Sequence, residues 1–230
     1  MTDMTEEQIR EVFDRTLKKY GEDVKWAAFE LDIPEFMDRY NYGMIVYFPC
    51  EEILTMEEYD EQRVWEIQQK MYPKIFGITD ALTEACREAG IPFEVPPVPP
   101  THQQPPYLAP FSSKYAGYKS GIGWIGKNNL LITYDYGPQI GTVGAVFYAK
   151  HMTVKPPVTV SECGSCDLCV KACPYKNIKG VDWKDGEVTR DDQVDYDRCN
   201  KIRFAAQVKL GRKMACAKCE VACPHGTKIP

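Results

Sequence analysis

The sequence has no uninterrupted apolar stretch of about 18 residues, the length that a membrane-spanning helix needs. Its first residues are acidic and show neither a basic region followed by an apolar run nor two adjacent arginines, so we expect no export signal. No tract of about five basic residues occurs, as a simple nucleic-acid-binding arm would have. Together these absences argue against a membrane or exported protein, and we expect a cytoplasmic one.

Cysteine, in contrast, is abundant, with ten residues. In a reducing cytoplasm, so many cysteines indicate metal binding rather than disulfide bonds. Oxygen-sensitive metal clusters would also suit an anaerobic cell. Eight of the cysteines follow a repeated pattern: Cys163, Cys166, Cys169 and Cys173-Pro174 form the run C-x2-C-x2-C-x3-C-P, Cys216, Cys219 and Cys223-Pro224 repeat its end, and Cys199 stands alone between them.

This spacing predicts two [4Fe–4S] clusters whose ligands cross between the motifs. Three closely spaced cysteines bind one cluster, whereas the cysteine before the proline is carried to the other cluster. We therefore assign one set to each cluster: Cys163, Cys166, Cys169 and Cys223 to the first, and Cys173, Cys199, Cys216 and Cys219 to the second. Structural zinc is the main alternative, because C-x2-C pairs also bind zinc, although zinc sites rarely use the full run.

The first 95 residues alternate between helix and strand patterns. A capping box at residues 5–8 opens an amphipathic helix over residues 5–20, and buried strands are expected at 26–31 and 43–49. A second capping box at residues 55–58 opens a helical stretch that reaches Gly90, with a break expected near Pro73. The alternation indicates an α+β fold with α/β layers.

The middle of the chain is rich in turns. Residues 92–110 hold eight prolines, which exclude a regular helix or a central strand and are typical of a functional loop. A short helix at 112–119, a glycine-rich turn and strands at 130–134 and 142–148 follow. Pro156-Pro157 lies in an expected linker, so we divide the chain into one domain at 1–155 and a second at 156–230.

The glycine-rich turn reads Gly121-Ile-Gly123-Trp124-Ile-Gly126, which has the form of the dinucleotide-binding motif G-x-G-x-x-G. That motif needs a strand before it and a helix after it, whereas here a helix precedes and a strand follows. Considered alone, the segment is either a tight turn or a binding loop of another kind.

Together with its surroundings, this loop resembles a known family. The stretch from Gly121 to Lys127, the following Leu130-Leu-Ile-Thr, a Gly137-Pro138 turn and the double-cluster motif are similar to the epoxyqueuosine reductases and reductive dehalogenases. Both are cobalamin-dependent iron–sulfur enzymes. The resemblance implies a nitroreductase-like domain that binds base-off cobalamin, followed by a ferredoxin-like module with two cubane clusters.

The resemblance also implies functional residues. The glycine loop would contact the corrin ring, so the candidate cobalamin contacts are Gly121, Gly123, Trp124, Gly126 and Lys127. For Lys127 the alternative is an ordinary surface lysine. The position that holds a proton-donating aspartate in epoxyqueuosine reductases falls on Tyr107, which is our candidate acid; packing in the proline-rich loop is the alternative.

Other cysteines and the histidines receive no catalytic role. His102, His151 and His225 lack the D-x-H-x-x-G context of a lower cobalt ligand, which agrees with base-off binding. A Cys–His pair using Cys50 or Cys86 is possible in principle, but buried structural thiols are the more common outcome.

The expected partners follow from the charge of the sequence and from the family resemblance. Residues 1–150 carry a net charge of −9 and residues 151–230 one of +4, which the negative charge of two clusters offsets. Because there is no basic stripe and the helical-repeat domain of the epoxyqueuosine enzymes is missing, we do not expect tRNA as a partner. We expect an external electron donor of the ferredoxin or flavodoxin type, and a small-molecule substrate or a corrinoid partner protein.

Three functions therefore compete. The first is a cytosolic reductase whose clusters deliver electrons to cobalamin for reduction of an unidentified substrate. The second is a ferredoxin-type electron-transfer protein without catalysis of its own, and the third is a protein that binds, reduces or delivers a corrinoid. Bound cobalamin would separate the second function from the other two.

Overall fold

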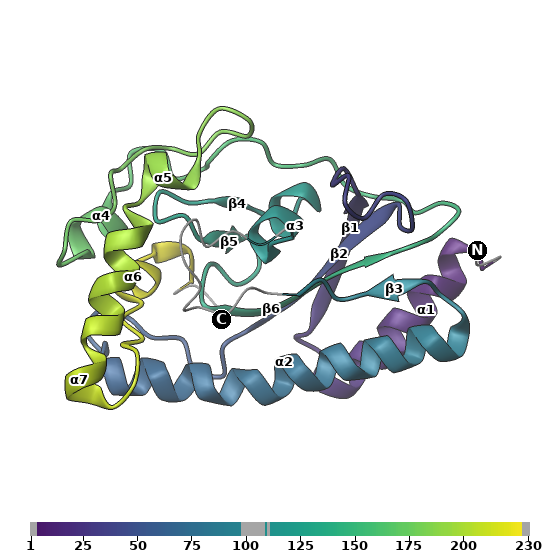
Figure 1. The fold of residues 1–230 in the computed structure, drawn as a ribbon, viewed down its shortest axis with the longest axis horizontal. Coiled ribbons are helices and arrows are strands. Elements are labelled where there is room, and N and C mark those ends of the chain that lie inside the picture. Colours follow the sequence, from purple (N-terminus) through teal and green to yellow (C-terminus); the bar gives the residue numbers. More distant parts are fainter. Residues whose placement is uncertain (1–3, 98–108, 110, 227–230) are drawn as a thin grey trace. The chain divides into compact units, whose positions relative to one another are not determined.

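The structure, a computed structural model, describes residues 4–97, 109 and 111–226 (Figure 1). It mixes helices and strands and divides into two compact units. Unit 1 consists of residues 1–49, 72–122 and 141–157, and unit 2 of residues 50–71, 123–140 and 158–230. The predicted boundary near residue 155 is therefore crossed twice, because segments 50–71 and 123–140 pack with the cysteine-rich part. The cobalamin-binding role of residues 1–155 stays a prediction.

The elements follow one another in an order close to the predicted one. They are α1 (Glu6–Leu17), η1 (Lys18–Tyr20), β1 (Lys25–Glu30), β2 (Tyr42–Pro49), α2 (Glu61–Ala89), β3 (Phe93–Glu94), α3 (Ser113–Lys119), β4 (Gly123–Ile125), β5 (Leu131–Thr133), β6 (Ile140–Phe147), α4 (Leu168–Ala172), α5 (Arg190–Gln193), α6 (Tyr196–Ala205), α7 (Gln207–Leu210), α8 (Lys218–Val221) and η2 (Pro224–Gly226). The short strands β3 and β4, the two 3-10 helices and the helices α4 to α8 were not predicted.

The amino-terminal helix begins where its capping box predicts. The Thr5 hydroxyl accepts a hydrogen bond from the Gln8 backbone N–H, and the Gln8 side chain accepts one from the Thr5 N–H. These bonds satisfy N–H groups that the first turn of a helix leaves unpaired. Beyond η1, Gly21 adopts φ +128°, so the chain turns there as expected.

The second long helix differs from the prediction at two points. Thr55 and Glu58 do form mutual hydrogen bonds, but they close a turn, and α2 begins at Glu61, where the Asp60 carboxylate accepts the Arg63 N–H. The predicted break near Pro73 is wrong, because α2 is one helix of 29 residues with Pro73 inside it. Pro73 removes one backbone hydrogen bond, and the buried side chains that follow, Ile78 and Leu82, hold the helix on the core.

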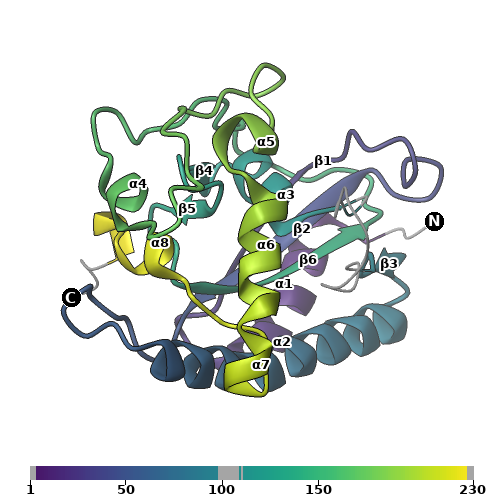
Figure 2. The same ribbon diagram turned by 60° about the vertical axis from the view of Figure 1, so that its left-hand side comes forward.

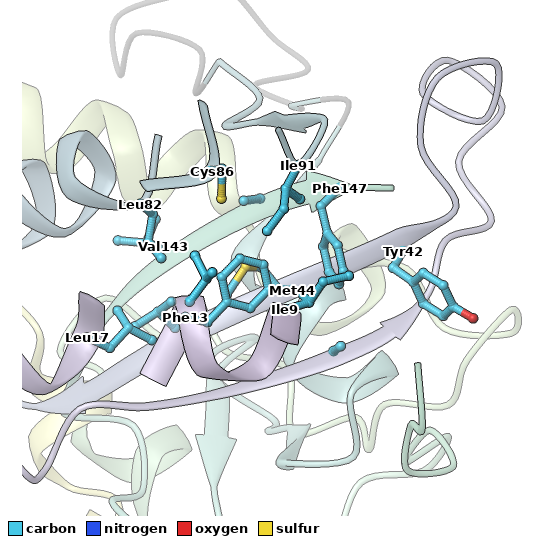
Figure 3. Close-up of a cluster of buried hydrophobic side chains, with 14 of the residues drawn as sticks. Ile9, Phe13, Leu17, Tyr42, Met44, Leu82, Cys86, Ile91, Val143 and Phe147 are labelled. Carbon is cyan, nitrogen blue, oxygen red and sulfur yellow. The ribbon is translucent and has the colours of Figure 1, made fainter. Parts of the chain in front are cut away.

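Unit 1 is built on a four-stranded sheet with the order β1-β2-β6-β3. Strands β1 and β2 are antiparallel, with Ala27 opposite Ile45, and so are β3 and β6, with Phe93 opposite Phe147. Helices α1 and α2 lie on one face of this sheet and α3 lies on the other (Figure 1). Phe13 from α1 packs edge-on against Phe147 from β6 at the centre of the core (Figure 3).

Unit 2 is mostly irregular chain around short helices. The β4–β5 hairpin pairs Trp124 with Ile132, and helices α4 and α8 lie side by side (Figure 2). Each of these helices begins within one of the two repeated cysteine motifs. The first segment, residues 50–71, contributes Leu54, Val64 and Ile67 to an apolar cluster with Ala215 and Val221. Among the described residues, no helix is both long enough and apolar enough to cross a membrane.

Candidate metal centre

Four cysteines of unit 2 line one pocket. They are Cys163, Cys166, Cys169 and Cys223, the set that the spacing assigns to the first cluster, and the pocket is completed by Asn128, Ile132, Pro224 and His225. Four thiols from two separate motifs at one pocket match the four cysteine ligands that a [4Fe–4S] cluster takes.

The thiols of this pocket influence one another. Burial, with smaller contributions from Cys163 and Cys166, raises the pKa of Cys169 to about 11. Burial, together with Cys163 and Cys169, likewise raises the pKa of Cys223 to about 11. Without a metal these two thiols stay protonated at neutral pH, so binding of a cluster to them releases protons.

The second set, Cys173, Cys199, Cys216 and Cys219, consists of partly buried thiols. The pKa of Cys199 is raised by burial, lowered by the charge of Arg203, and raised by Cys216 and Cys173. Burial raises the pKa of Cys219, and Cys216 and Cys199 act in the same direction. Cys199 thus interacts with Cys173 and Cys216, and Cys219 with Cys199 and Cys216, although these cysteines come from three separate stretches of sequence.

A buried amide lies beside this second set without its own partners. Asn177 is 2% exposed, and neither its Nδ2 nor its Oδ1 has a hydrogen-bond partner among the described residues. Its backbone N–H donates to the Cys173 sulfur at 3.4 Å, which places Asn177 beside this set. A buried amide normally forms hydrogen bonds, so Asn177 fits a site whose missing acceptor is a cluster sulfur or thiolate.

The backbone at the second motif adopts a rare conformation. Cys216 has φ +56° and Ala217 has φ +57°, in the left-handed region that favours glycine. Such residues each cost about 1 kcal/mol or more and are found where the surrounding structure enforces them, often at functional sites. In this case the two residues turn the chain into α8, which carries Cys219.

Lys127 of the glycine loop is used inside unit 2. Its side chain is 9% exposed, and its Nζ donates to the carbonyl oxygens of Gly164 at 2.6 Å and Cys166 at 3.1 Å. The Asp182 carboxylate lies 3.7 Å from the same Nζ. Lys127 is therefore not a surface lysine, and it holds the loop that carries Cys163 and Cys166.

The rest of the glycine loop is also packed against the protein. Trp124 is 2% exposed, lies against Cys223 and Cys163, and meets the His225 ring edge-on. A Cβ on Gly123 would lie 2.0 Å from the Ile132 carbonyl oxygen, and one on Gly126 would lie 2.5 Å from the Ile132 side chain. Glycine is needed at these two positions for close packing of the hairpin, which does not require a corrin.

The remaining predicted residues lie elsewhere. Gly121 belongs to unit 1, where its φ of +70° closes the turn after α3. Tyr107 lies outside the described residues. Cys50 and Cys86 are 7% and 0% exposed, and burial raises the pKa of each thiol, so both are structural, as expected. Their packing makes neither a candidate nucleophile.

Sequence reasoning missed three polar residues of this site. The Asn128 amide donates to the Cys219 carbonyl at 2.8 Å, and the fully buried Gln193 amide donates to the carbonyls of Gly126 and Val181. Asn177 is the third. Asn128 and Gln193 join segments that are far apart in sequence, and Asn177 lies beside a cysteine motif. No local sequence pattern marks such positions.

The two buried amides allow a test of the second cluster site. Asn177→Leu is expected to make the reduction potential of the second cluster more negative, because a lost N–H donor no longer stabilises the more negative reduced state. The free energy of unfolding should change little, because no protein partner is lost. Potentiometric titration followed by electron paramagnetic resonance measures the potential.

Gln193→Leu is the matched control. It leaves the carbonyls of Gly126 and Val181 without their donor and should lower the free energy of unfolding by about 2 kcal/mol, with no specific change in potential. Asn177 does not face a cluster if Asn177→Leu and Gln193→Leu lower the free energy of unfolding equally and give the second cluster the same reduction potential.

Comparison with known proteins agrees with this geometry. Residues 162–226 match the family model described as a 4Fe-4S double cluster binding domain. Over 111 residues the chain is 33% identical to epoxyqueuosine reductase of Listeria monocytogenes, a match that covers 46% of this chain and 27% of that protein. Epoxyqueuosine reductase of Cellulophaga algicola is 37% identical over 70 residues, covering 30% of this chain and 22% of the relative. The matches thus span about a quarter of these curated relatives.

Solved structures share the fold at low sequence identity. A crystal structure of epoxyqueuosine reductase with an epoxyqueuosine-modified tRNA stem loop has a TM-score of 0.59 and 15% identity, covering 97% of this chain and 67% of that chain. A catabolic reductive dehalogenase has a TM-score of 0.60 and 14% identity, covering 89% of this chain and 30% of that chain.

One expectation about partners is wrong. We set tRNA aside because of the charge distribution, but the curated relatives are epoxyqueuosine reductases and one structural neighbour binds a tRNA stem loop. The reasoning failed because the net charge of a long segment does not show where a polyanion makes contact.

The resemblance in sequence and in fold is confirmed. The cysteine motifs, the matched double-cluster model, the similarity to curated reductases and the shared fold all agree. The chain is thus similar in sequence to the epoxyqueuosine reductases and shares the fold of their solved structures and of a reductive dehalogenase.

Proposed function

We propose that this chain is an oxidoreductase in which two [4Fe–4S] clusters of unit 2 supply electrons to cobalamin for reduction of a substrate. The observation that carries the proposal is the pocket in which Cys163, Cys166 and Cys169 meet Cys223, since this is the crossed ligand set of a two-cluster module. When bound, the clusters and cobalamin would supply one-electron transfer and a reducing metal centre. A nitroreductase-like form of unit 1 and cytoplasmic location belong to this proposal.

The residues of the chain itself have separate tasks in this proposal. The eight cysteines hold the clusters, while Lys127 and Asn128 fix the loops that carry Cys166 and Cys219 through their backbone carbonyls. Trp124 and Ile132 form an apolar wall beside Cys223 and limit access of water to the first cluster. Tyr107 remains our candidate proton donor.

The residues of this chain support cobalamin binding less directly than they support cluster binding. The family supports the cofactor, but Gly123, Trp124, Gly126 and Lys127 are all engaged by unit 2 itself. These four residues therefore have no role toward cobalamin in this proposal. Their engagement favours, as second candidate, an electron-transfer protein that passes electrons to a partner and catalyses nothing.

The test is to reconstitute the protein with its cofactors and to measure which of them it retains. After anaerobic reconstitution with iron, sulfide and cobalamin, gel filtration should leave about eight irons per chain together with cobalamin. The first substrate to offer is an epoxyqueuosine-modified tRNA stem loop, because a structural neighbour binds one. Retained clusters without cobalamin or turnover would support the electron-transfer candidate instead.

A further inference from the structure

Residues 196–216 form a hairpin that we call the α6–α7 hairpin. Helix α6 leads into α7, and the chain then returns to Cys216 (Figure 2). The Arg203 side chain donates to the Met214 carbonyl at 2.8 Å, and the Met214 N–H donates to the Arg203 carbonyl at 3.0 Å. These bonds tie the two arms together and bring Cys199 towards Cys216, both assigned to the second cluster.

The α6–α7 hairpin is strongly basic. It contains six basic residues and one acidic residue, Asp197. Arg212 is neutralised by Glu61 at 2.9 Å, and Lys201 is paired with Asp197 at 2.6 Å. Arg198 and Lys209 are exposed and form no ion pair with any described residue. The net positive charge of the hairpin is thus available to a partner.

Two apolar side chains of the same basic hairpin are exposed to solvent. Val208 of α7 is 94% exposed and Leu210 is 42% exposed, among the large apolar side chains of the described chain that face solvent. A protein interface commonly combines apolar contacts with charged residues at its rim. Lys209 is the neighbour of Val208 in α7, and Arg198 lies near the start of α6 in the same hairpin.

We propose that the α6–α7 hairpin is the docking surface for an acidic one-electron carrier protein, which delivers electrons to the second cluster. The inference rests on the proposed function, since it needs a cluster held by Cys199 and Cys216. Docking on the hairpin would place the carrier on the segment that supplies two ligands of that cluster, Cys199 and Cys216. Opposite charges would speed the encounter, and the effect would weaken with salt.

A tRNA would be the other polyanionic partner for such a surface. Single-stranded RNA is usually held by basic residues together with exposed aromatic rings on which bases stack. The exposed large apolar residues of the hairpin, Val208 and Leu210, are aliphatic. Together with the two cysteines in the same segment, this favours a protein carrier.

The experiment follows reduction of the reconstituted, full chain by stopped-flow absorbance. The probe is a reduced [2Fe–2S] ferredoxin, an acidic one-electron carrier. Arg198→Glu/Lys209→Glu is expected to lower the second-order rate constant about tenfold at low salt and to abolish its decrease with added salt. Lys19→Glu, at another exposed lysine in unit 1, is the control with the same type of charge change and should keep the wild-type rate.

The outcomes separate this proposal from the proposed function. If the wild-type chain retains no iron and sulfide, the proposed function fails first. If all variants hold clusters that photoreduced deazaflavin reduces normally, and ferredoxin reduces all of them at one rate, the docking surface is wrong. Weaker binding of a tRNA stem loop by the double variant, with unchanged reduction by ferredoxin, would also overturn it and identify an RNA-binding surface.

Discussion

Replacing Cys223 with alanine is expected to reduce the iron content of the reconstituted protein from about eight to about four atoms per chain. Cys223 is 5% exposed and lines one pocket with Cys163, Cys166 and Cys169, which lie far from it in sequence. Without its thiolate the first cluster lacks one of four ligands, whereas the second set is intact. Iron and sulfide analysis after gel filtration gives the result.

The same variant tests how ligands cross between motifs. Electron paramagnetic resonance of the reduced protein should show that Cys223→Ala and Cys163→Ala lose the same cluster signal, whereas Cys216→Ala loses the other one. If Cys223→Ala and Cys216→Ala lose the same signal, the ligand sets do not cross and our assignment is wrong. Cys86→Ala is the control, since Cys86 is fully buried in unit 1 and should leave the iron content unchanged.

The second large effect is expected for Lys127→Met, which keeps the aliphatic stem and removes the charged amine. The carbonyls of Gly164 and Cys166 then lose their buried donor, and we expect the free energy of unfolding to fall by about 2–3 kcal/mol. The first cluster should also be retained less well, because both carbonyls belong to the loop that supplies Cys163 and Cys166. Chemical denaturation and iron analysis measure the two effects.

Lys171→Met provides the matched control in the same unit. Lys171 is 70% exposed and forms a surface ion pair with Asp167, so its loss should change the free energy of unfolding by less than about 0.5 kcal/mol. Equal stability and equal iron retention of the two variants would mean that Lys127 does not support the cluster loop.

Local patterns predicted the local structure well. The capping box at Thr5 specified the start of α1 because its hydrogen bonds involve only residues three apart. The cysteine spacing identified the four cysteines that line the first pocket, because in this motif the cysteine before the proline binds the other cluster. Gly90 ended α2 as expected, with a φ of +69°.

Long-range contacts were not predictable in this way. Pro73 was expected to break a helix, but core packing by α2 outweighs the lost hydrogen bond. The carbonyls held by Lys127 lie 37 and 39 residues away, and no periodicity connects them. The family resemblance predicts corrin contacts for the glycine loop, and it gave no sign that Trp124 and Lys127 also lie against the cluster loops.

The most direct test of the account is a reductive titration of the reconstituted chain with one equivalent of cobalamin, followed by electron paramagnetic resonance. We predict signals of two reduced [4Fe–4S] clusters together with a cobalt spectrum that lacks nitrogen superhyperfine splitting, as base-off cobalamin gives. Cluster signals accompanied by the spectrum of free cobalamin would contradict a cobalamin-dependent reductase. A folded chain that holds zinc and no sulfide would contradict the cluster assignment itself.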